Sequence, residues 1–245
     1  MDTHLLYILI PAIALIAFLY SCVGHAGASG YIAVMTLVGL STAVIKPTAL
    51  ILNIFVAVIG SYQFWRAGYF SWRLFWPFAL LSVPMAYLGG YLHVPVHMLK
   101  VLIGIVLWLS AARLFFRQGD PSEVAPPSKP VSLGVGAGIG FLSGLTGTGG
   151  GIFLTPLLLF CKWARTRNAA AISALFILVN SISGLVGYYS SGRSAPNFAW
   201  GLAVAAVVGG TLGSYFGSRK FPVRVIQLLL GAVLVIAGFK LIFAK

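Results

Sequence analysis

The stretch SGLTGTGGGIFLTP, residues 143–156, contains three consecutive glycines, Gly149, Gly150 and Gly151. Each glycine disfavours a helix by about 1 kcal/mol relative to alanine, so we expect a helix to break here. Apolar segments lie on both sides, which puts the break inside a membrane-embedded sequence. Non-helical backbone at that depth persists only where protein buries it or where it lines a watery cavity. Broken helices of this kind mark the substrate sites of secondary transporters, so the stretch predicts a site built on backbone amides.

The composition indicates an all-α polytopic membrane protein. The chain has 245 residues, of which 60% are hydrophobic and 8% charged, and its mean hydropathy is +1.00. A soluble domain carries about 25% charged residues. Apolar runs long enough to span a bilayer, about 20 residues, fall near 4–22, 45–66, 72–92, 95–116, 131–146, 168–190, 197–217 and 222–243. Two shorter runs, near 31–41 and 152–161, have the length of half-helices. We therefore expect about eight full spans and two half-helices.

The charges exclude several function classes. Lys and Arg total 16 against 3 acids, but the basic residues stand singly at the ends of apolar runs. That placement is typical of positive-inside anchors and not of a nucleic-acid surface. The acids are Asp2, Asp120 and Glu123, and none lies inside a predicted span. Their positions disfavour carboxylate proton relays and cation sites, which leaves an anion or a neutral solute as cargo. We expect no metal, cofactor or ATP site.

The two halves of the chain resemble each other. A shift of 122 residues superposes Ser21 on Ser143 and Gly27 on Gly149, and a shift of 124 superposes Gly60 on Gly184. We therefore predict a first transmembrane repeat at 1–116, a linker at 117–130 and a second repeat at 131–245. His25-Ala-Gly-Ala-Ser-Gly30 becomes the counterpart of the triple-glycine break.

Counting Lys and Arg decides the orientation of the repeats. If each half crosses the membrane an odd number of times, one side receives 11 basic residues and the other 5; four crossings per half divide them 8 to 8. The positive-inside rule favours the first arrangement. It predicts inverted repeats, a cytoplasmic linker and both termini outside.

Residues 144–156, GLTGTGGGIFLTP, resemble the glycine-rich signature of the sulfite exporter TauE/SafE family. The similarity continues through RNAAAISAL at 167–175 and LGSYFG at 212–217, and it extends over nearly the whole chain. It implies a multi-pass transporter of the bacterial inner membrane, with members associated with export of sulfite or organosulfonates. The first half departs from the pattern, because Gly27-Ala28-Ser29 replaces a run of glycines and His25 adds an imidazole.

The two breaks are the candidate binding site. Consecutive amides form a concave nest, and the half-helix that follows presents the positive end of its dipole to an anion. The candidate residues are the break backbone, nearby hydroxyls and two amides: His25, Gly27, Ala28, Ser29, Asn53, Thr146, Thr148, Gly149, Gly150, Gly151 and Asn180. The alternative for the glycines is close helix packing through small residues.

Three side chains of this set, together with Lys46 outside it, have two interpretations each. His25 either faces the cavity, where it carries a proton or bonds the anion, or is a satisfied core histidine. Asn53 and Asn180 either contact cargo or join helices. Lys46, at the start of a predicted helix, either attracts anions or reaches towards the membrane surface.

Two other functions remain open. Gly27-Ala28-Ser29-Gly30 is spelled like the serine motif of rhomboid intramembrane proteases, but a nucleophilic serine needs a base within reach and no suitably placed histidine follows. A membrane assembly protein without transport is the third possibility. The sequence favours a secondary transporter, not an enzyme, that moves a small sulfur-containing or organic anion by alternating access, driven by the membrane potential.

Overall fold

The computed structural model describes residues 3–92, 108, 111–112, 115 and 120–243, and the regular structure in these residues is entirely helical. The helices are α1 (Thr3–Ser21), α2 (Ala28–Leu37), α3 (Thr42–Arg66), α4 (Trp72–Tyr91), α6 (Lys129–Thr146), α7 (Gly151–Phe160), α8 (Thr166–Ser190), α9 (Phe198–Tyr215), the π-helix η1 (Phe216–Lys220) and α10 (Val223–Phe243). The all-helical class is confirmed. Most of the span predicted at 95–116 lies outside the described residues.

The helix lengths separate two kinds of segment. By length and composition, four described segments can cross a membrane: α3, α4, α8, and α9 together with η1. The helices α2 and α7 have ten residues each, which is about 15 Å at 1.5 Å per residue. That is half of a hydrocarbon core of about 30 Å. The number of complete spans remains a prediction.

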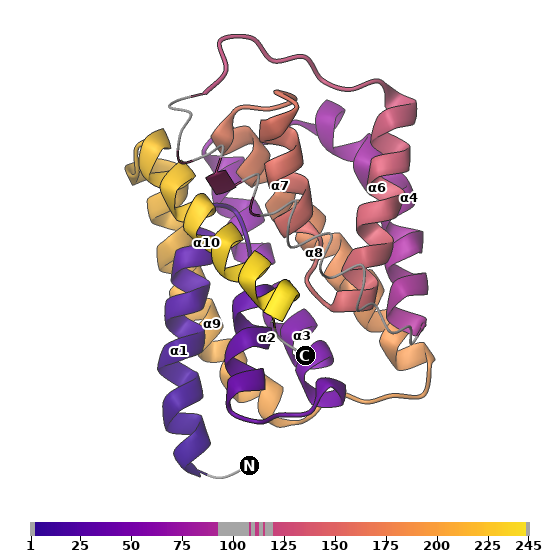
Figure 1. The fold of residues 1–245 in the computed structure, drawn as a ribbon, viewed down its shortest axis with the longest axis vertical. Helices are drawn as coiled ribbons and strands as arrows, with labels where there is room; N and C mark the ends of the chain where they lie inside the picture. Colours follow the sequence, from indigo (N-terminus) through magenta and orange to yellow (C-terminus); the bar gives the residue numbers. More distant parts are fainter. Residues whose placement is uncertain (1–2, 93–107, 109–110, 113–114, 116–119, 244–245) are drawn as a thin grey trace.

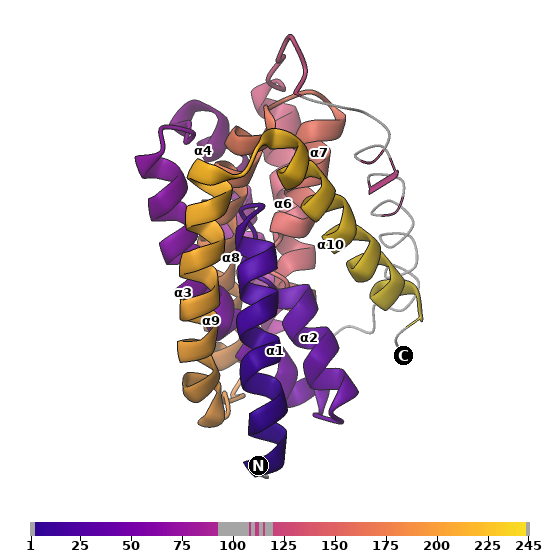
Figure 2. The same cartoon turned by 90° about the vertical axis from the view of Figure 1, so that its left-hand side faces the viewer.

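The bundle has two distinct ends. In Figure 1 the linker, the start of α6 and the end of α7 lie at the top, which we call the linker end; α1 begins at the opposite end. Helix α1 rises from the opposite end and α2 returns towards it, whereas α6 descends from the linker end and α7 returns (Figures 1 and 2). Each half-helix therefore begins inside the bundle.

Three helix pairs form the body of the molecule. Helix α4 packs along α6, α1 along α9, and α3 along α8. Helix α4 also contacts α8, and α3 also contacts α9. Each of these contacts joins a helix that precedes the linker to one that follows it.

Glycines at four-residue intervals bring two of these pairs into backbone contact. In α6 they are Gly136, Gly140 and Gly144, each facing a carbonyl oxygen of α4. Gly209 and Gly213 of α9 and Gly217 of η1 face carbonyl oxygens of α1 and its end in the same way. A Cβ at any of the six would overlap the facing oxygen. Small residues allow this approach in membranes, where dispersion and weak Cα–H···O contacts stabilise helix pairs.

The sequence did not predict the π-helix η1. The span expected at 197–217 instead ends as α9 at Tyr215, and the chain continues with a wider turn closed by a bond from the Phe221 amide to the Phe216 carbonyl. This turn keeps Gly217 against the backbone of Cys22.

The glycine contacts predict opposite effects of alanine at neighbouring positions of α6. Gly140→Ala places a methyl group into the Ser82 backbone, whereas a Cβ at Gly138 meets nothing within 4 Å. We expect Gly140→Ala to destabilise the fold by about 1–3 kcal/mol, as overpacking does. Gly138→Ala should be neutral or slightly stabilising, because alanine favours a helix. The measurement is the midpoint of SDS-induced unfolding of each purified variant; equal midpoints would contradict the contact.

Candidate functional site

Glycines in left-handed conformations form both helix breaks. Gly24 and Gly27, with φ of 76° and 107°, lie between α1 and α2. Gly147, Gly149 and Gly150, with φ of 75°, 77° and 83°, lie between α6 and α7. Other residues adopt such φ values at a cost of about 1–2 kcal/mol. The predicted interruption of the helix at the triple glycine is confirmed, and the backbone geometry explains two of its three glycines; Gly151 is already the first residue of α7.

Each break packs against the long helix of the other half. A Cβ at Gly24 would collide with the backbone of Ala170 in α8, and one at Gly147 would lie 3.0 Å from Cγ of Lys46 in α3. Ala170 follows Lys46 by 124 residues, one of the offsets found in the sequence. Both breaks are therefore enclosed by protein, as the membrane interior requires of non-helical backbone.

Both apolar and polar side chains pack on the N-terminus of α7, with Ile177 the nearest neighbour of Gly149 and Gly151. A Cβ at Gly149 would lie 2.8 Å from Nδ2 of Asn53 and 2.9 Å from Oγ of Ser181. A Cβ at Gly150 would lie 2.9 Å from the Phe176 ring and 3.3 Å from Cβ of Ser143. The first amides of a helix have no intrahelical partner and carry the positive end of its dipole. Because glycine has no side chain, residues of the neighbouring helices form the surroundings of these amides.

His25 connects the two breaks. It is 4% exposed, and its Nε2 lies 2.8 Å from the hydroxyl of Thr155 in α7. That hydroxyl donates to Oγ of Ser173 in α8 over 2.6 Å. The other ring nitrogen, Nδ1, is buried without a hydrogen-bond partner. His25 is thus half satisfied, which combines features of the two interpretations offered by the sequence.

The two asparagines lie in corresponding helices, α3 and α8, about one turn apart in the repeat alignment, and they have different surroundings. Asn180 accepts a bond from Ser82 Oγ over 2.6 Å and donates to the Phe176 carbonyl over 2.9 Å. Asn53 donates to Ser181 Oγ over a long 3.4 Å, and its Oδ1 has no partner. Both residues are fully buried. Asn180 therefore joins helices, whereas Asn53 keeps an unused polar atom beside Gly149.

Four of the buried polar atoms that lack a hydrogen-bond partner lie at the breaks, whereas others, such as Ser61 Oγ and Gln63 Oε1, lie near the end of α3. Besides His25 Nδ1 and Asn53 Oδ1, the hydroxyls of Ser21 and Ser143 are buried without a partner. Ser21 ends α1 and Ser143 lies beside Gly150. Buried polar groups in folded proteins are almost always hydrogen-bonded, so such a group calls for water or a ligand. The sequence singled out neither serine as a site residue, although it paired them in the repeat alignment.

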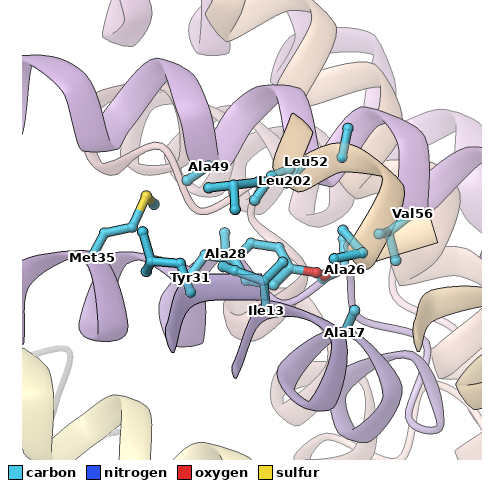
Figure 3. Close-up of a cluster of buried hydrophobic side chains, with 14 of the residues drawn as sticks. Ile13, Ala17, Ala26, Ala28, Tyr31, Met35, Ala49, Leu52, Val56 and Leu202 are labelled. Atoms are coloured by element: carbon cyan, nitrogen blue, oxygen red, sulfur yellow. Dashed lines mark hydrogen bonds between the residues drawn. The ribbon is translucent and has the colours of Figure 1, made fainter. Parts of the chain in front are cut away.

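The other predicted residues have mainly structural roles. Thr146 donates back to the Leu142 carbonyl over 2.7 Å and lies 2.9 Å from the hydroxyl of Thr148. Ser29 Oγ is 2.9 Å from the hydroxyl of Tyr20. Ala28, the first residue of α2, lies in a cluster of buried apolar side chains with Tyr31, whose hydroxyl donates to the Ala26 carbonyl (Figure 3).

The Tyr31 ring also fills the space beside Gly27, where an added Cβ would lie 2.7 Å from the ring. This apolar cluster holds the first break in place.

Thr155 was not among the candidate residues predicted from the sequence. It lies four residues after Gly151, one turn into α7, so helical spacing puts it on the face of that glycine. Ser173, its partner, was not among the predicted site residues either. Their connection to His25 needs the three-dimensional arrangement, because 130 residues separate His25 from Thr155.

The linker contributes a cap at its own end of the bundle. Oδ1 of Asp120 accepts from the Thr166 amide over 2.7 Å and from the Thr166 hydroxyl. Arg167, the next residue, donates to the Tyr69 hydroxyl and to the Phe221 carbonyl. An acid at a helix N-terminus satisfies free amides and complements the dipole. These bonds tie the linker, α8 and the start of α10 together.

The sequence of the chain matches a known protein family. The model of the family described as sulfite exporter TauE/SafE matches residues 9–241, which includes both breaks and all three helix pairs. The chain belongs to this family. It is a membrane transporter, and the resemblance carried by the glycine-rich motif is confirmed.

Curated relatives of this family are named as transporters. Probable membrane transporter protein y4hK of Sinorhizobium fredii is 42% identical over 99% of this chain and 100% of its own length. Probable membrane transporter protein YdhB of Bacillus subtilis is 25% identical over 96% of this chain and 100% of its own. A protein of the same description from Methanocaldococcus jannaschii, MJ0441, is 24% identical over 78% of this chain and 76% of its own. No solved structure matches this family member significantly.

The difference between the two asparagines predicts different costs of removing them. Asn180→Leu leaves the Ser82 hydroxyl without its partner and removes a side-chain bond to the Phe176 carbonyl, and we expect a loss of about 1–3 kcal/mol. Asn53→Leu removes one long bond and an unpartnered oxygen, so its unfolding midpoint should stay close to that of the original protein. SDS-induced unfolding of the two purified variants measures both changes in stability. A larger loss for Asn53→Leu would show that Asn53 is the structural residue.

Proposed function

We propose that this TauE/SafE protein is a secondary exporter of a small sulfur-containing or organic anion, such as sulfite or a sulfonate, and that it works by alternating access. The central site would form where the two breaks meet. The observation that carries the proposal is the convergence of two half-helix N-termini on buried polar atoms that have no partner. The proposed contacts are the amides at 27–29 and 149–151 and the side chains of His25, Asn53 and Ser143.

The charge of the site supports an anion. Helix N-termini and consecutive amides attract negative charge. The described carboxylates, Asp120 and Glu123, both lie in the linker, so neither competes with an anion at the breaks. An oxyanion with three oxygens accepts several hydrogen bonds, which matches amides together with the hydroxyl of Ser143. The side chains of Thr146, Thr148, Ser29 and Asn180 act in this proposal as supports, because each has a partner within the protein.

The pairing of helices supports inverted repeats. If α1, α3 and α4 correspond to α6, α8 and α9, exchanging the halves converts the α4–α6 pair into the α9–α1 pair. The same exchange converts the packing of Gly24 on Ala170 into that of Gly147 on Lys46. The repeats of this proposal are the residues 1–116 and 131–245. Rocking of one half against the other would then expose the central site alternately.

The distribution of charge supports a cytoplasmic linker and termini outside. Eleven Lys and Arg side chains are described, and nine of them lie on segments at the linker end: Arg66, Arg73, Lys129, Lys162, Arg165, Arg167, Arg219, Lys220 and Arg224. Positive charges collect on the cytoplasmic side of membrane proteins. In a bacterial inner membrane this orientation opens the other end of the bundle to the periplasm.

The contacts of Ser29 weigh against the protease alternative. A serine nucleophile needs a base within hydrogen-bond reach. His25 uses Nε2 for Thr155, and its Nδ1 is without a partner. The serine hydroxyl instead faces the phenol of Tyr20. The anion-binding experiment described next distinguishes a transporter from an assembly protein without transport.

Anion binding to the purified protein is the direct test. We expect one or more of sulfite, sulfate, thiosulfate, taurine, sulfoacetate and acetate to raise the unfolding temperature selectively. A ligand at 100 times its Kd stabilises by about 2.7 kcal/mol. Gly150→Leu should abolish the shift, since a side chain there meets Phe176 and Ser143. Gly192→Leu is the matched control, because Gly192 has φ 79° but open space around it. No shift with any anion would favour a neutral cargo or the assembly role.

The driving force has its own test. The sequence holds no ATP-binding motif, so we do not assign ATP hydrolysis as the driving force. An anion that leaves the cell would gain free energy from the membrane potential, about 2.3 kcal/mol per charge at 100 mV. We expect efflux from proteoliposomes to accelerate when a potassium–valinomycin gradient makes the lumen negative, and to slow when the gradient is reversed. Rates that do not respond to the sign of the potential would rule out net charge movement.

A further inference from the structure

The end of the bundle opposite the linker carries a cluster of positive charge. The two described Lys and Arg side chains outside the linker end are Lys46 in α3 and Arg193 after α8. They come from distant parts of the sequence, yet both lie over the ring of Tyr188, at 5.9 Å and 4.2 Å from its centroid. If Lys46 and Arg193 were independent anchors at the membrane surface, we would not expect both to contact the same ring.

The protein holds these two cations in defined positions. Arg193 donates to the carbonyls of Gly90 and Tyr91 over 2.8 and 3.0 Å, and its Nε donates to Ser191 Oγ over 2.6 Å. Lys46 Nζ lies 3.4 Å from the Gly89 carbonyl. The C-terminal carbonyls of α4 thus offset part of the positive charge.

Tyr188 is itself fixed, because its hydroxyl donates to the Ala43 carbonyl over 2.8 Å. The ring that both cations share therefore stays in one place between α3 and α8.

No carboxylate among the described residues balances the pair. Asp120 and Glu123 belong to the linker, and Asp120 is bonded to Thr166 at the far end of α8 from Tyr188. Lys46 and Arg193 are both half-buried, so their mutual repulsion is screened less than at an open surface. Half-buried like charges that share a ring without a counter-charge form a ready site for an external anion.

The position of Lys46 connects this cluster to the second break. Its aliphatic stem packs on Gly147, the first left-handed glycine after α6. An anion held by the ammonium group is therefore adjacent to the loop that leads to Gly149 and Gly150. The equivalent position in the other half is Ala170, which has no charge. The position equivalent to Lys46 therefore contributes no cation at the linker end, where Arg167 lies over the ring of Tyr69 instead.

We propose that Lys46 and Arg193 form a second anion site, at the mouth opposite the linker, which holds a small oxyanion outside the central site. The role of this site in transport rests on the proposed function, whereas the binding of an anion to it does not. The ligand class is an oxyanion such as sulfite, sulfate or the headgroup phosphate of a lipid, because a lysine and an arginine side by side suit a group with several negative oxygens. We assign the site to the soluble anion.

Binding is tested first, without transport. The Gly150→Leu variant, in which the central site is closed, is placed in nanodiscs of phosphatidylcholine, and radiolabelled sulfate binding is measured at about 0.01 M ionic strength, where the Debye length is ~30 Å. We expect saturable binding that Lys46→Gln weakens about tenfold and Lys46→Arg preserves. Lys129→Gln is the matched control, since Lys129 lies 5.7 Å from the ring of Trp76 at the linker end.

The role in transport is tested in membrane vesicles of both orientations. We expect Lys46→Gln to raise KM for sulfite about tenfold when sulfite is offered at the mouth opposite the linker, with kcat nearly unchanged. From the linker side KM should stay the same. The difference in KM between Lys46→Gln and the original protein should vanish at about 1 M salt, where the Debye length falls to ~3 Å. Lys46→Arg should restore KM, which a purely structural role of the stem would not require.

The outcomes separate the two proposals. Sulfate binding that ignores Lys46→Gln, or no binding to Gly150→Leu, overturns the mouth site whatever the protein transports. Lys46-dependent binding in a protein that moves no anion supports the mouth site and contradicts the transport function. If phosphatidylglycerol in the nanodisc occupies Lys46 and Arg193 and sulfate does not bind there, the site belongs to lipid headgroups and the soluble anion is excluded. Equal changes of KM on both sides would assign Lys46 to the central site.

Discussion

The structure depends on one constraint, which is that backbone leaving a helix inside a membrane needs protein around it. The two breaks meet this requirement by reciprocal packing. Gly24 lies on α8 and Gly147 lies on α3, so each half of the chain shields the break of the other. His25 adds a polar connection from the first break to α7. The backbone amides at the breaks are thereby kept from lipid.

The glycine contacts determine how tightly this shield closes. Helices α4 and α6, and likewise α1 and α9, approach until carbonyl oxygens face Cα atoms. Such contacts use dispersion instead of the hydrophobic effect, which is weak between apolar surfaces in lipid. They fix the outer walls, and α3 and α8 pack between them with the asparagines inside. Asn53 and Asn180 therefore lie on the two helices at the centre of the bundle.

Much of the fold followed from the sequence, because hydropathy and glycine spacing act locally. The bounds of α3, α4 and α8 fall within three residues of their apolar runs, and the half-helices appear where small residues interrupt the pattern. The π-helix after Tyr215 was not predictable, since its wider turn depends on packing against Cys22. The candidate site was predicted in its backbone and only partly in its side chains. Asn53 and Asn180 look alike in sequence, and only their neighbours distinguish them.

The interlaced helix pairs also determine the order in which the protein can be completed. Helix α4 meets its partner α6 soon after synthesis, because only the segment 92–128 separates them. Helix α1 is made first, yet its tight partner is α9, which begins at Phe198. About four-fifths of the chain must therefore leave the ribosome before the first helix finds its place. Until then the face of α1 that packs on α9 has only lipid, or the membrane insertion machinery, as its neighbour, whereas the first break is already covered once α8 is in place.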